Sequence, residues 1–127
     1  MQIGEVAERT GLSLRTIRHY EEVGLVVPSA RTKGGFRLYT ATDVDRLMVI
    51  RRMKPLDFSL EEMRDLLTIT DRLSSAEPLE DTERDRLRER LDTYRKVADA
   101  RCEKLRAQLM AAEDFAATLR RRLRADA

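Results

Sequence analysis

No glycine or proline occurs after Pro78 in this chain of 127 residues. In the same stretch, apolar residues recur at steps of mostly four and three: Leu87, Leu91, Tyr94, Ala98, Cys102, Leu105, Leu109, Ala112, Ala116, Leu119 and Leu123. This spacing predicts one long helix with the apolar seam of a coiled coil. A thin helix cannot bury such a seam by itself, so another surface must cover it.

Two surfaces could cover the seam. The long helix could fold back onto the rest of the chain, but it is too long for so small a body to cover. We therefore expect self-association, through an interface that contains Leu87, Leu91, Tyr94, Ala98, Cys102, Leu105, Leu109 and Ala112. Two consecutive steps of four around Ala98 and Cys102 indicate a stutter, which locally unwinds a supercoil.

The start of the chain predicts two short helices across a tight turn. Apolar residues at positions 3, 6 and 7 have the spacing of a helix with one buried face, which Gly11 interrupts. Ser13 is a favourable N-cap for a second helix, because its hydroxyl can accept a hydrogen bond from a free amide of the first turn. Gly24 suits the left-handed position just after a helix.

The outward face of the second helix carries candidate DNA-reading residues. Ile17 and Tyr20 point inward at i and i+3, which leaves five polar side chains outside: Arg15, Thr16, Arg18, His19 and Glu22. Such a face can enter a major groove, where arginine grips guanine O6 and N7 and threonine contacts a base edge or a thymine methyl. The alternative is a solvated amphipathic helix that binds nothing.

A basic hairpin follows and favours the DNA-binding interpretation. Two short runs meet at Lys33-Gly34-Gly35, where paired glycines supply the positive φ angles of a tight turn. The hairpin presents Arg31, Lys33 and Arg37 on an element too short to have much core of its own. The tip of such a basic hairpin is suited to phosphate contacts.

The helix pair and the hairpin together closely resemble the MerR family of bacterial transcription regulators. The resemblance extends through residue 67 and rests on Ile17, Arg18, His19, Tyr20, Glu21, Gly24, Leu25, Pro28, Gly35, Phe36, Arg37 and Tyr39. His19 stands where the family usually has a tyrosine, so an imidazole replaces a hydroxyl at an expected phosphate contact. Asp57 stands where the family usually has a glycine, and it can adopt a left-handed backbone at modest cost.

Two more helices are predicted within the region of resemblance. Thr40 and Asp43 form a capping-box-like start for the third helix, which Pro55 ends by about residue 54. The apolar surface of this helix consists of Val44, Leu47, Met48, Ile50 and Met53. Residues 59–62, Ser-Leu-Glu-Glu, form a full capping box for the fourth helix. Its apolar positions at i, i+3 and i+7 are Leu60, Met63 and Leu67.

The predicted fold class is mainly α. We expect residues 1–72 to form a winged helix-turn-helix DNA-binding domain with a small β-hairpin wing. Residues 73–79 are then a linker, and residues 80–127 form the long dimerising coiled-coil helix with its basic tail.

The resemblance also implies partners. Regulators of this family dimerise through an antiparallel coiled coil of their long C-terminal helices, and the two heads bind a pseudo-palindromic promoter site. They typically bend and untwist a long promoter spacer, which brings misaligned polymerase elements into phase. The partners expected here are double-stranded DNA, a second copy of the chain and RNA polymerase at the promoter.

The candidate DNA-binding residues divide into two groups. For base readout we expect Arg15, Thr16 and Arg18. For phosphate or minor-groove contacts we expect His19, Tyr20, Arg31, Lys33, Arg37 and Tyr39. Tyr20 is an amphipathic residue whose ring can lie in the core while its hydroxyl stays exposed.

Charge is distributed unevenly along the chain. The formal net charge is only +2, but residues 1–54 hold ten Lys or Arg against six Asp or Glu, residues 55–92 six against twelve, and residues 93–127 nine against five. Basic charge therefore collects on the proposed DNA-binding domain and at the C-terminal end of the chain.

No apolar run approaches the roughly twenty residues needed to cross a bilayer. Without a signal segment, the expected location is the cytoplasm, in association with the nucleoid.

Other chemistries have little support in the sequence. Cys102 is the single cysteine; it suits packing within the seam, and oxidant sensing across a dimer is the alternative. With one cysteine and one histidine, we expect neither a metal site nor a cofactor. The carboxylates of Glu21, Glu22, Glu61 and Glu62 are interpreted as caps and solvated faces, so no enzymatic activity is expected.

The arginine-rich tail has two interpretations. Residues 120–124, Arg-Arg-Arg-Leu-Arg, suit a solvated helix end that favours the negative C-terminal dipole. The alternative is an added contact to DNA or to acidic groups of the polymerase.

The sequence as a whole predicts a dimeric, sequence-specific transcription regulator of MerR type that binds a pseudo-palindromic promoter site and distorts the DNA. Two alternatives remain open. One is an architectural or accessory DNA-binding protein that needs no inducer. The other is an interaction adaptor whose coiled coil recruits a partner and whose head has lost DNA binding.

Overall fold

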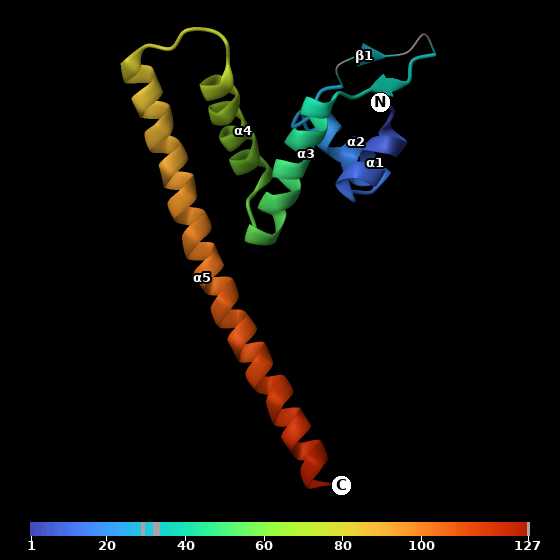
Figure 1. The fold of residues 1–127 in the computed structure, drawn as a ribbon, viewed down its shortest axis with the longest axis vertical. Helices are drawn as coiled ribbons and strands as arrows, with labels where there is room; N and C mark the ends of the chain where they lie inside the picture. The colour runs from blue at the N-terminus through green and yellow to red at the C-terminus, as the bar shows by residue number, and fades with distance from the viewer. Residues whose placement is uncertain (29, 32–33, 127) are drawn as a thin grey trace. The chain divides into compact units, whose positions relative to one another are not determined.

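The computed structural model describes residues 1–28, 30–31 and 34–126, which form two compact units. The first unit, residues 1–78, is called the head below. It contains α1 (Ile3–Thr10), α2 (Leu14–Glu22), β1 (Ala30–Arg31), β2 (Arg37–Leu38), α3 (Ala41–Met53), the 3-10 helix η1 (Lys54–Leu56) and α4 (Leu60–Ser74) (Figure 1). The second unit is the single helix α5 (Asp81–Ala125). This architecture confirms the predicted fold class.

The starts of α2, α3 and α4 are fixed by side-chain caps, as expected. The Thr16 amide donates to Ser13 Oγ at 3.0 Å. Thr40 and Asp43 cap reciprocally, since the Thr40 amide donates to Asp43 Oδ2 at 2.8 Å and the Asp43 amide donates to Thr40 Oγ1 at 3.2 Å. Ser59 and Glu62 form the same two-way box on α4. Because these caps are local, they set the helix starts before any tertiary packing is needed.

The end of α3 also agrees with the sequence prediction. The α-helix stops at Met53, and Pro55 lies in the short η1 that follows. Asp57 then adopts a left-handed backbone, with φ 62° and ψ 34°. The chain can thus reverse between α3 and α4 without a glycine at the turn.

The wing is a two-stranded antiparallel hairpin. Ala30 lies opposite Leu38, and Arg31 lies opposite Arg37. Gly35 has the positive φ, 83°, that the sequence predicted for this turn. At the base of the wing, backbone hydrogen bonds of 2.7 Å run both ways between residue 39 and Met1. The wing is therefore held to the N-terminus as well as to the helices.

The core of the head lies where α1, α2, α3 and α4 meet the segment after α2. Its buried apolar residues are Val6, Ile17, Tyr20, Leu25, Val26, Tyr39, Leu47, Ile50, Met53, Phe58, Met63, Leu67 and Ile69. Leu60 was expected on the buried face of α4 but is 36 % exposed, whereas Ile69 is fully buried. Leu60 is the first residue of α4, and its side chain points back toward the helix start, away from the packed middle of the helix.

Two arginines tie the later helices to the end of α2. Arg46 of α3 donates from Nε to the Leu25 carbonyl at 2.6 Å and from Nη1 to both carboxylate oxygens of Asp71 at 2.8 Å. Arg64 of α4 donates to the Val23 carbonyl. Carbonyl groups just after a helix lack intrahelical partners, so these bonds satisfy them and fix the orientation of α2.

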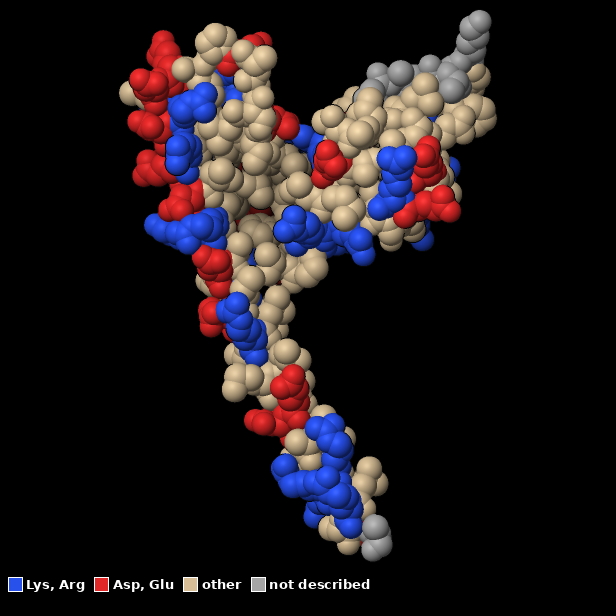
Figure 2. All heavy atoms as spheres, in the orientation of Figure 1, with Lys and Arg blue, Asp and Glu red and all other residues tan. Residues whose placement is uncertain are grey.

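The long helix α5 runs unbroken for 45 residues, and none of its residues between Asp81 and Ala125 is buried. Acidic side chains line its start, and basic side chains gather at its C-terminal end (Figure 2). Within the described residues, no helix is both long and apolar enough to span a bilayer.

Candidate nucleic-acid interface

The outer face of α2 forms an open polar surface, as its periodicity predicted. Arg15, Arg18 and His19 are exposed, and Thr16 is half-buried. An open hollow of about 780 Å³ runs along this face, lined by Arg15, Thr16, Arg18, His19, Tyr20, Glu22 and Lys54. Ser13 Oγ donates to Thr16 Oγ1 at 2.8 Å, which leaves the hydroxyl proton of Thr16 for an outside acceptor. This face offers the donors that base edges and phosphates accept.

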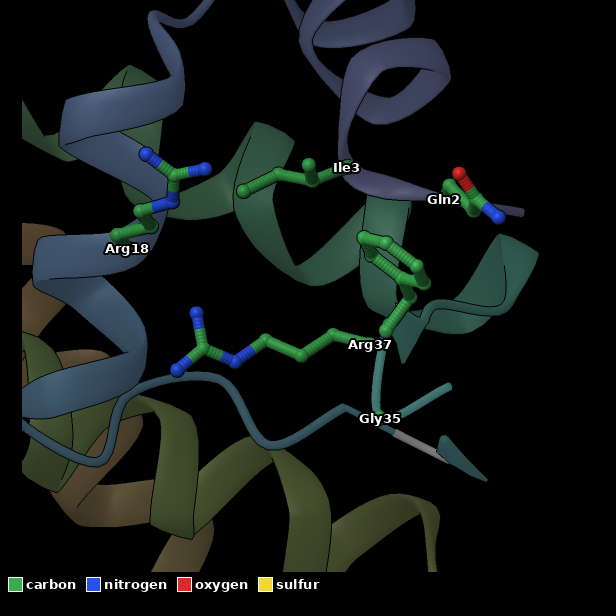
Figure 3. A pocket seen from close by; sticks show the side chains of 6 residues that line it. Gln2, Ile3, Arg18, Gly35 and Arg37 are labelled. Carbon is green, nitrogen blue, oxygen red and sulfur yellow. The ribbon is translucent and has the colours of Figure 1, made fainter. Parts of the chain in front are cut away.

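A second hollow connects α2 with the wing. It has a volume of about 260 Å³ and is lined by Gln2, Ile3, Arg18, Gly35, Phe36 and Arg37. Figure 3 shows Arg37 reaching from β2 toward α2, with Arg18 leaving α2 on the same side of the hollow. Arg18 lines both hollows. The two cations that the sequence assigned to helix and wing therefore share one surface.

Glu21 joins the wing to α2. Its Oε1 atom pairs with Arg37 Nε at 2.7 Å, and its Oε2 atom accepts a hydrogen bond from the Tyr39 hydroxyl at 2.9 Å. The Glu21 side chain is only 12 % exposed, so its interpretation as a solvated carboxylate was wrong. The partners that bury it come from a later segment of the chain, which helix periodicity does not report.

The two tyrosines of the predicted site lie in the core. Tyr20 is 1 % exposed, and its hydroxyl, expected at the surface, is buried without a hydrogen-bond partner among the described residues. Tyr39 is 2 % exposed and donates to Glu21. Both rings fill space beneath α2 and the wing, which corrects the expectation that their hydroxyls face DNA.

Burial changes the acidity of Tyr39. Removal from water disfavours the phenolate, and the adjacent Glu21 carboxylate disfavours it further. Together these effects raise the pKa of Tyr39 to about 12. The hydroxyl thus stays protonated and keeps donating to Glu21 at any physiological pH.

Of the predicted wing residues, Arg31 is described only in its backbone and Lys33 is not described. The backbone of Arg31 lies in β1 opposite Arg37. Lys33 lies outside the described residues, and so does the side chain of Arg31. Their proposed phosphate contacts stay predictions.

The structure adds two residues that the sequence interpretation missed. Lys54, interpreted there only as the end of α3, lines the hollow beside α2. Phe36 is 65 % exposed at the wing and lines the hollow beside Arg18 and Arg37. A signal for Lys54 was present, because Arg51, Arg52 and Lys54 form a basic cluster at the end of the third helix.

The apolar seam of α5 is a separate candidate surface. Leu87, Leu91, Tyr94, Ala98 and Cys102 are partly exposed, and Ala112 is exposed. Farther along the seam, Leu105 is 42 % exposed and Leu109 58 %, and Leu119 and Leu123 are exposed as well. An apolar stripe that is partly exposed in its first half and mostly exposed in its second half is typical of an interaction surface.

Metal and redox chemistry find no constellation in the described part of the chain. Cys102 is a free, half-buried thiol. No group of three or more His, Cys, Asp or Glu side chains among the described residues is arranged to hold a metal ion.

Comparison with known proteins gives two overlapping family matches. Residues 1–68 match the model described as MerR HTH family regulatory protein. Residues 44–122 match the model described as MerR, DNA binding. The two matches together cover the head and most of α5.

Individual relatives agree with these matches. The mercuric resistance operon regulatory protein of Bacillus cereus is 45 % identical over 71 residues, which are 56 % of this chain and 54 % of that protein. The chain thus spans about half the length of the curated relatives it matches.

Solved structures are similar over most of the chain. MtaN, the N-terminal part of the Bacillus subtilis multidrug transporter activator, is 28 % identical, with a TM-score of 0.57 and 97 % of each chain covered. HiNmlR, a MerR family regulator lacking the sensor domain and bound to promoter DNA, is 23 % identical, with a TM-score of 0.70 over 90 % of this chain and 78 % of that one. At that identity, the likeness to HiNmlR concerns the fold.

Proposed function

Because the chain belongs to the MerR family of regulatory proteins, we propose that it binds double-stranded promoter DNA as a dimer and regulates transcription. One observation carries the proposal. Arg18 of α2 and Arg37 of the wing line the same open hollow, although they come from separate elements. One arginine on the helix and one on the wing, facing the same open hollow, suit a base edge and the neighbouring phosphate of a duplex.

In this proposal α2 enters the major groove. Arg15, Thr16 and Arg18 reach base edges, since they lie on the outer face and their side chains can donate hydrogen bonds. His19 and Lys54 border the same hollow and contact phosphates. Arg37, with Arg31 and Lys33 of the wing, contacts the backbone beside the groove. These phosphate contacts fix the register in which the base contacts are made.

The second half of the proposal concerns α5. Its exposed seam is covered by the same seam of a second copy, in the antiparallel coiled coil that the family resemblance implies. A two-fold axis then places two heads on one duplex, and each head takes half of a pseudo-palindromic site. The C-terminal half of the seam is apolar and exposed in the single chain, which favours such a partner.

Regulation follows from deformation of the DNA. In this proposal the coiled coil links the two heads, so a promoter spacer whose half-sites do not match them must bend or untwist to bind both. The cost of that deformation depends on the sequence between the half-sites. In this proposal the distorted spacer is what RNA polymerase recognises.

The experiment is a footprint of the full chain on genomic fragments, with the double variant Arg18→Ala/Arg37→Ala as the control. The proposal predicts one protected palindrome whose centre becomes hypersensitive to cleavage, and no protection by the double variant. Protection that spreads along the fragment would favour the architectural alternative. Protection of no fragment at any ionic strength would overturn the proposal and favour the adaptor.

A further inference from the structure

Glu21 is an acidic residue on the helix that we propose to lie against phosphates. A negative charge at that place repels DNA, so its presence needs a reason. Both of its carboxylate oxygens are engaged, by Arg37 Nε at 2.7 Å and by the Tyr39 hydroxyl at 2.9 Å. Neither partner belongs to α2, and both belong to the end of the wing.

Arg37 and Tyr39 are two residues apart in an extended segment, so their side chains lie on the same face of it. Glu21 contacts that one face with both of its oxygens. The backbone at Tyr39 is bonded independently to Met1. The outgoing strand of the wing is thus fixed to α2 through side chains and to the N-terminus through its backbone.

The pairing leaves part of the Arg37 guanidinium free to act. Its Nε atom is buried and contacts Glu21 as an ion pair without a hydrogen bond of its own, whereas the side chain as a whole is 35 % exposed. The terminal nitrogens of Arg37 are not among the buried unpaired atoms, and the side chain lines the hollow shared with Arg18 (Figure 3). An arginine held at Nε keeps a planar pair of N–H donors for a second acceptor.

We propose that Glu21 is a positioning residue of the DNA interface, which holds Arg37 at a set reach from α2 so that Arg37 contacts the phosphate backbone beside the base edges that Arg18 reaches. The inference rests on the proposed function, because it places a duplex at this hollow. Its physical basis is preorganisation: a side chain fixed before binding loses less conformational entropy when the complex forms.

A positioning role and simple charge repulsion predict opposite changes in DNA affinity when Glu21 is neutralised. If Glu21 were only a negative charge near DNA, Glu21→Gln would remove repulsion and strengthen binding. If Glu21 positions Arg37, Glu21→Gln weakens binding even though the protein becomes more positive. Glutamine keeps the size of the side chain and can still accept from the Tyr39 hydroxyl, so the substitution mainly removes the ionic hold on Arg37.

The test measures fluorescence anisotropy of a labelled duplex of random sequence at low ionic strength, with the full chain. Glu22→Gln is the matched control, because Glu22 is the next residue of α2, is exposed and borders the hollow beside α2. On a duplex of random sequence, the measured affinity reports contacts that do not depend on the base sequence, so a change in base readout at Glu21 or Glu22 does not contribute. Glu21→Gln should bind about five- to tenfold more weakly than wild type. Glu22→Gln should bind as tightly as wild type or more tightly.

A double-mutant cycle separates positioning from a general loss of structure. In the wild-type background, Arg37→Ala should lower the salt slope by about one phosphate contact. In the Glu21→Gln background, Arg37→Ala should cause little further loss, because Arg37 is already misplaced. Tyr39→Phe removes the other bond to Glu21 and should leave affinity within about twofold. Thermal melting of each variant confirms that binding is measured on folded protein.

The outcomes distinguish the two proposals. If wild type binds the duplex but Glu21→Gln binds as tightly or more tightly, or if the losses from Glu21→Gln and Arg37→Ala simply add, the positioning role is overturned and the proposed function stands. If wild type binds no duplex at any ionic strength, the proposed function itself fails.

Discussion

Single residues of the proposed interface have different roles: one arginine reads the base sequence and another binds phosphate. Arg18 lies on the outer face of α2, and Arg37 reaches in from the wing. Arg18→Ala should weaken binding by about 1–3 kcal/mol and relax the choice of sequence, because a bidentate base contact is lost. Arg37→Ala should weaken binding to every sequence alike.

This division can be measured on two duplexes, one enriched by selection from a random pool and one with the same bases shuffled. Dissociation constants over a range of salt concentrations should show a lower salt slope for Arg37→Ala and a lower selected-to-shuffled ratio for Arg18→Ala. Equal losses from both variants on both duplexes would contradict the assignment.

Tyr39 gives a pH prediction at the same scale. Its pKa is about 12 in the folded chain against an ordinary value of 10.0, so the folded state holds the phenol proton more tightly. The stabilisation by neutral Tyr39 is complete below pH 10 and is lost as the pH rises to 12, a loss of about 2 kcal/mol. The free energy of unfolding of wild type should fall faster than that of Tyr39→Phe between these pH values. Parallel curves for the two proteins would contradict this pKa.

Some residues of the candidate site could be placed from the sequence, and others could not. The outward positions of Arg15, Arg18 and His19 follow from the period of a helix, which acts over neighbouring residues. The burial of Glu21 and Tyr39 depends on contacts between α2 and the wing, 18 residues apart for their hydrogen bond. No local pattern contains that contact, so a carboxylate that looked solvated and a tyrosine that looked exposed were both misplaced.

At the scale of elements, the turn between α3 and α4 stores a small strain. Asp57 has φ 62°, a left-handed backbone that costs a residue with a side chain about 1–2 kcal/mol. Asp57→Gly relieves this cost but makes the unfolded chain more flexible, so we expect a net gain in unfolding free energy of up to about 1 kcal/mol. Asp57→Val, with its branched side chain, should lose stability. Urea unfolding measures both changes, and a loss on Asp57→Gly would show that the aspartate side chain makes a stabilising contact.

The seam of α5 predicts different effects for two adjacent residues. Leu109 belongs to the seam and Met110 does not, although both are well exposed in the single chain, 58 % and 66 %. They point about 100° apart around the helix. Leu109→Asp should raise the dimer dissociation constant by about tenfold or more, because a charge enters an apolar interface. Met110→Asp should leave the constant nearly unchanged.

Sedimentation equilibrium of both variants tests this prediction. Equal effects of the two substitutions would show that the seam is not the interface.

The helices themselves were predictable because their signals are local: Ser13, Thr40 and Ser59 begin helices, and Pro55 ends one. The apolar repeat of the seam could also be recognised in the sequence of α5. The surface that covers the seam could not, because it lies outside that helix.

In the complete protein, the proposed function needs both units: a head that contacts DNA and a helix that pairs two heads. In the proposed dimer neither part suffices for an operator-sized site, because one head would contact only half of a palindrome. Linking two heads raises their effective concentration on one duplex, so we expect a dimer to bind far more tightly than an isolated head. A variant that stays monomeric, such as Leu109→Asp, should therefore lose affinity for the full site and keep its weak affinity for a half-site.

In the proposed complex, two copies of this chain together hold one duplex. Light scattering of a size-separated mixture of the full chain with a selected duplex gives the mass of the complex directly. We expect two chains per duplex at low ionic strength, dissociating as salt is raised. A complex with one chain per duplex, or no complex with any double-stranded DNA at low ionic strength, would contradict it.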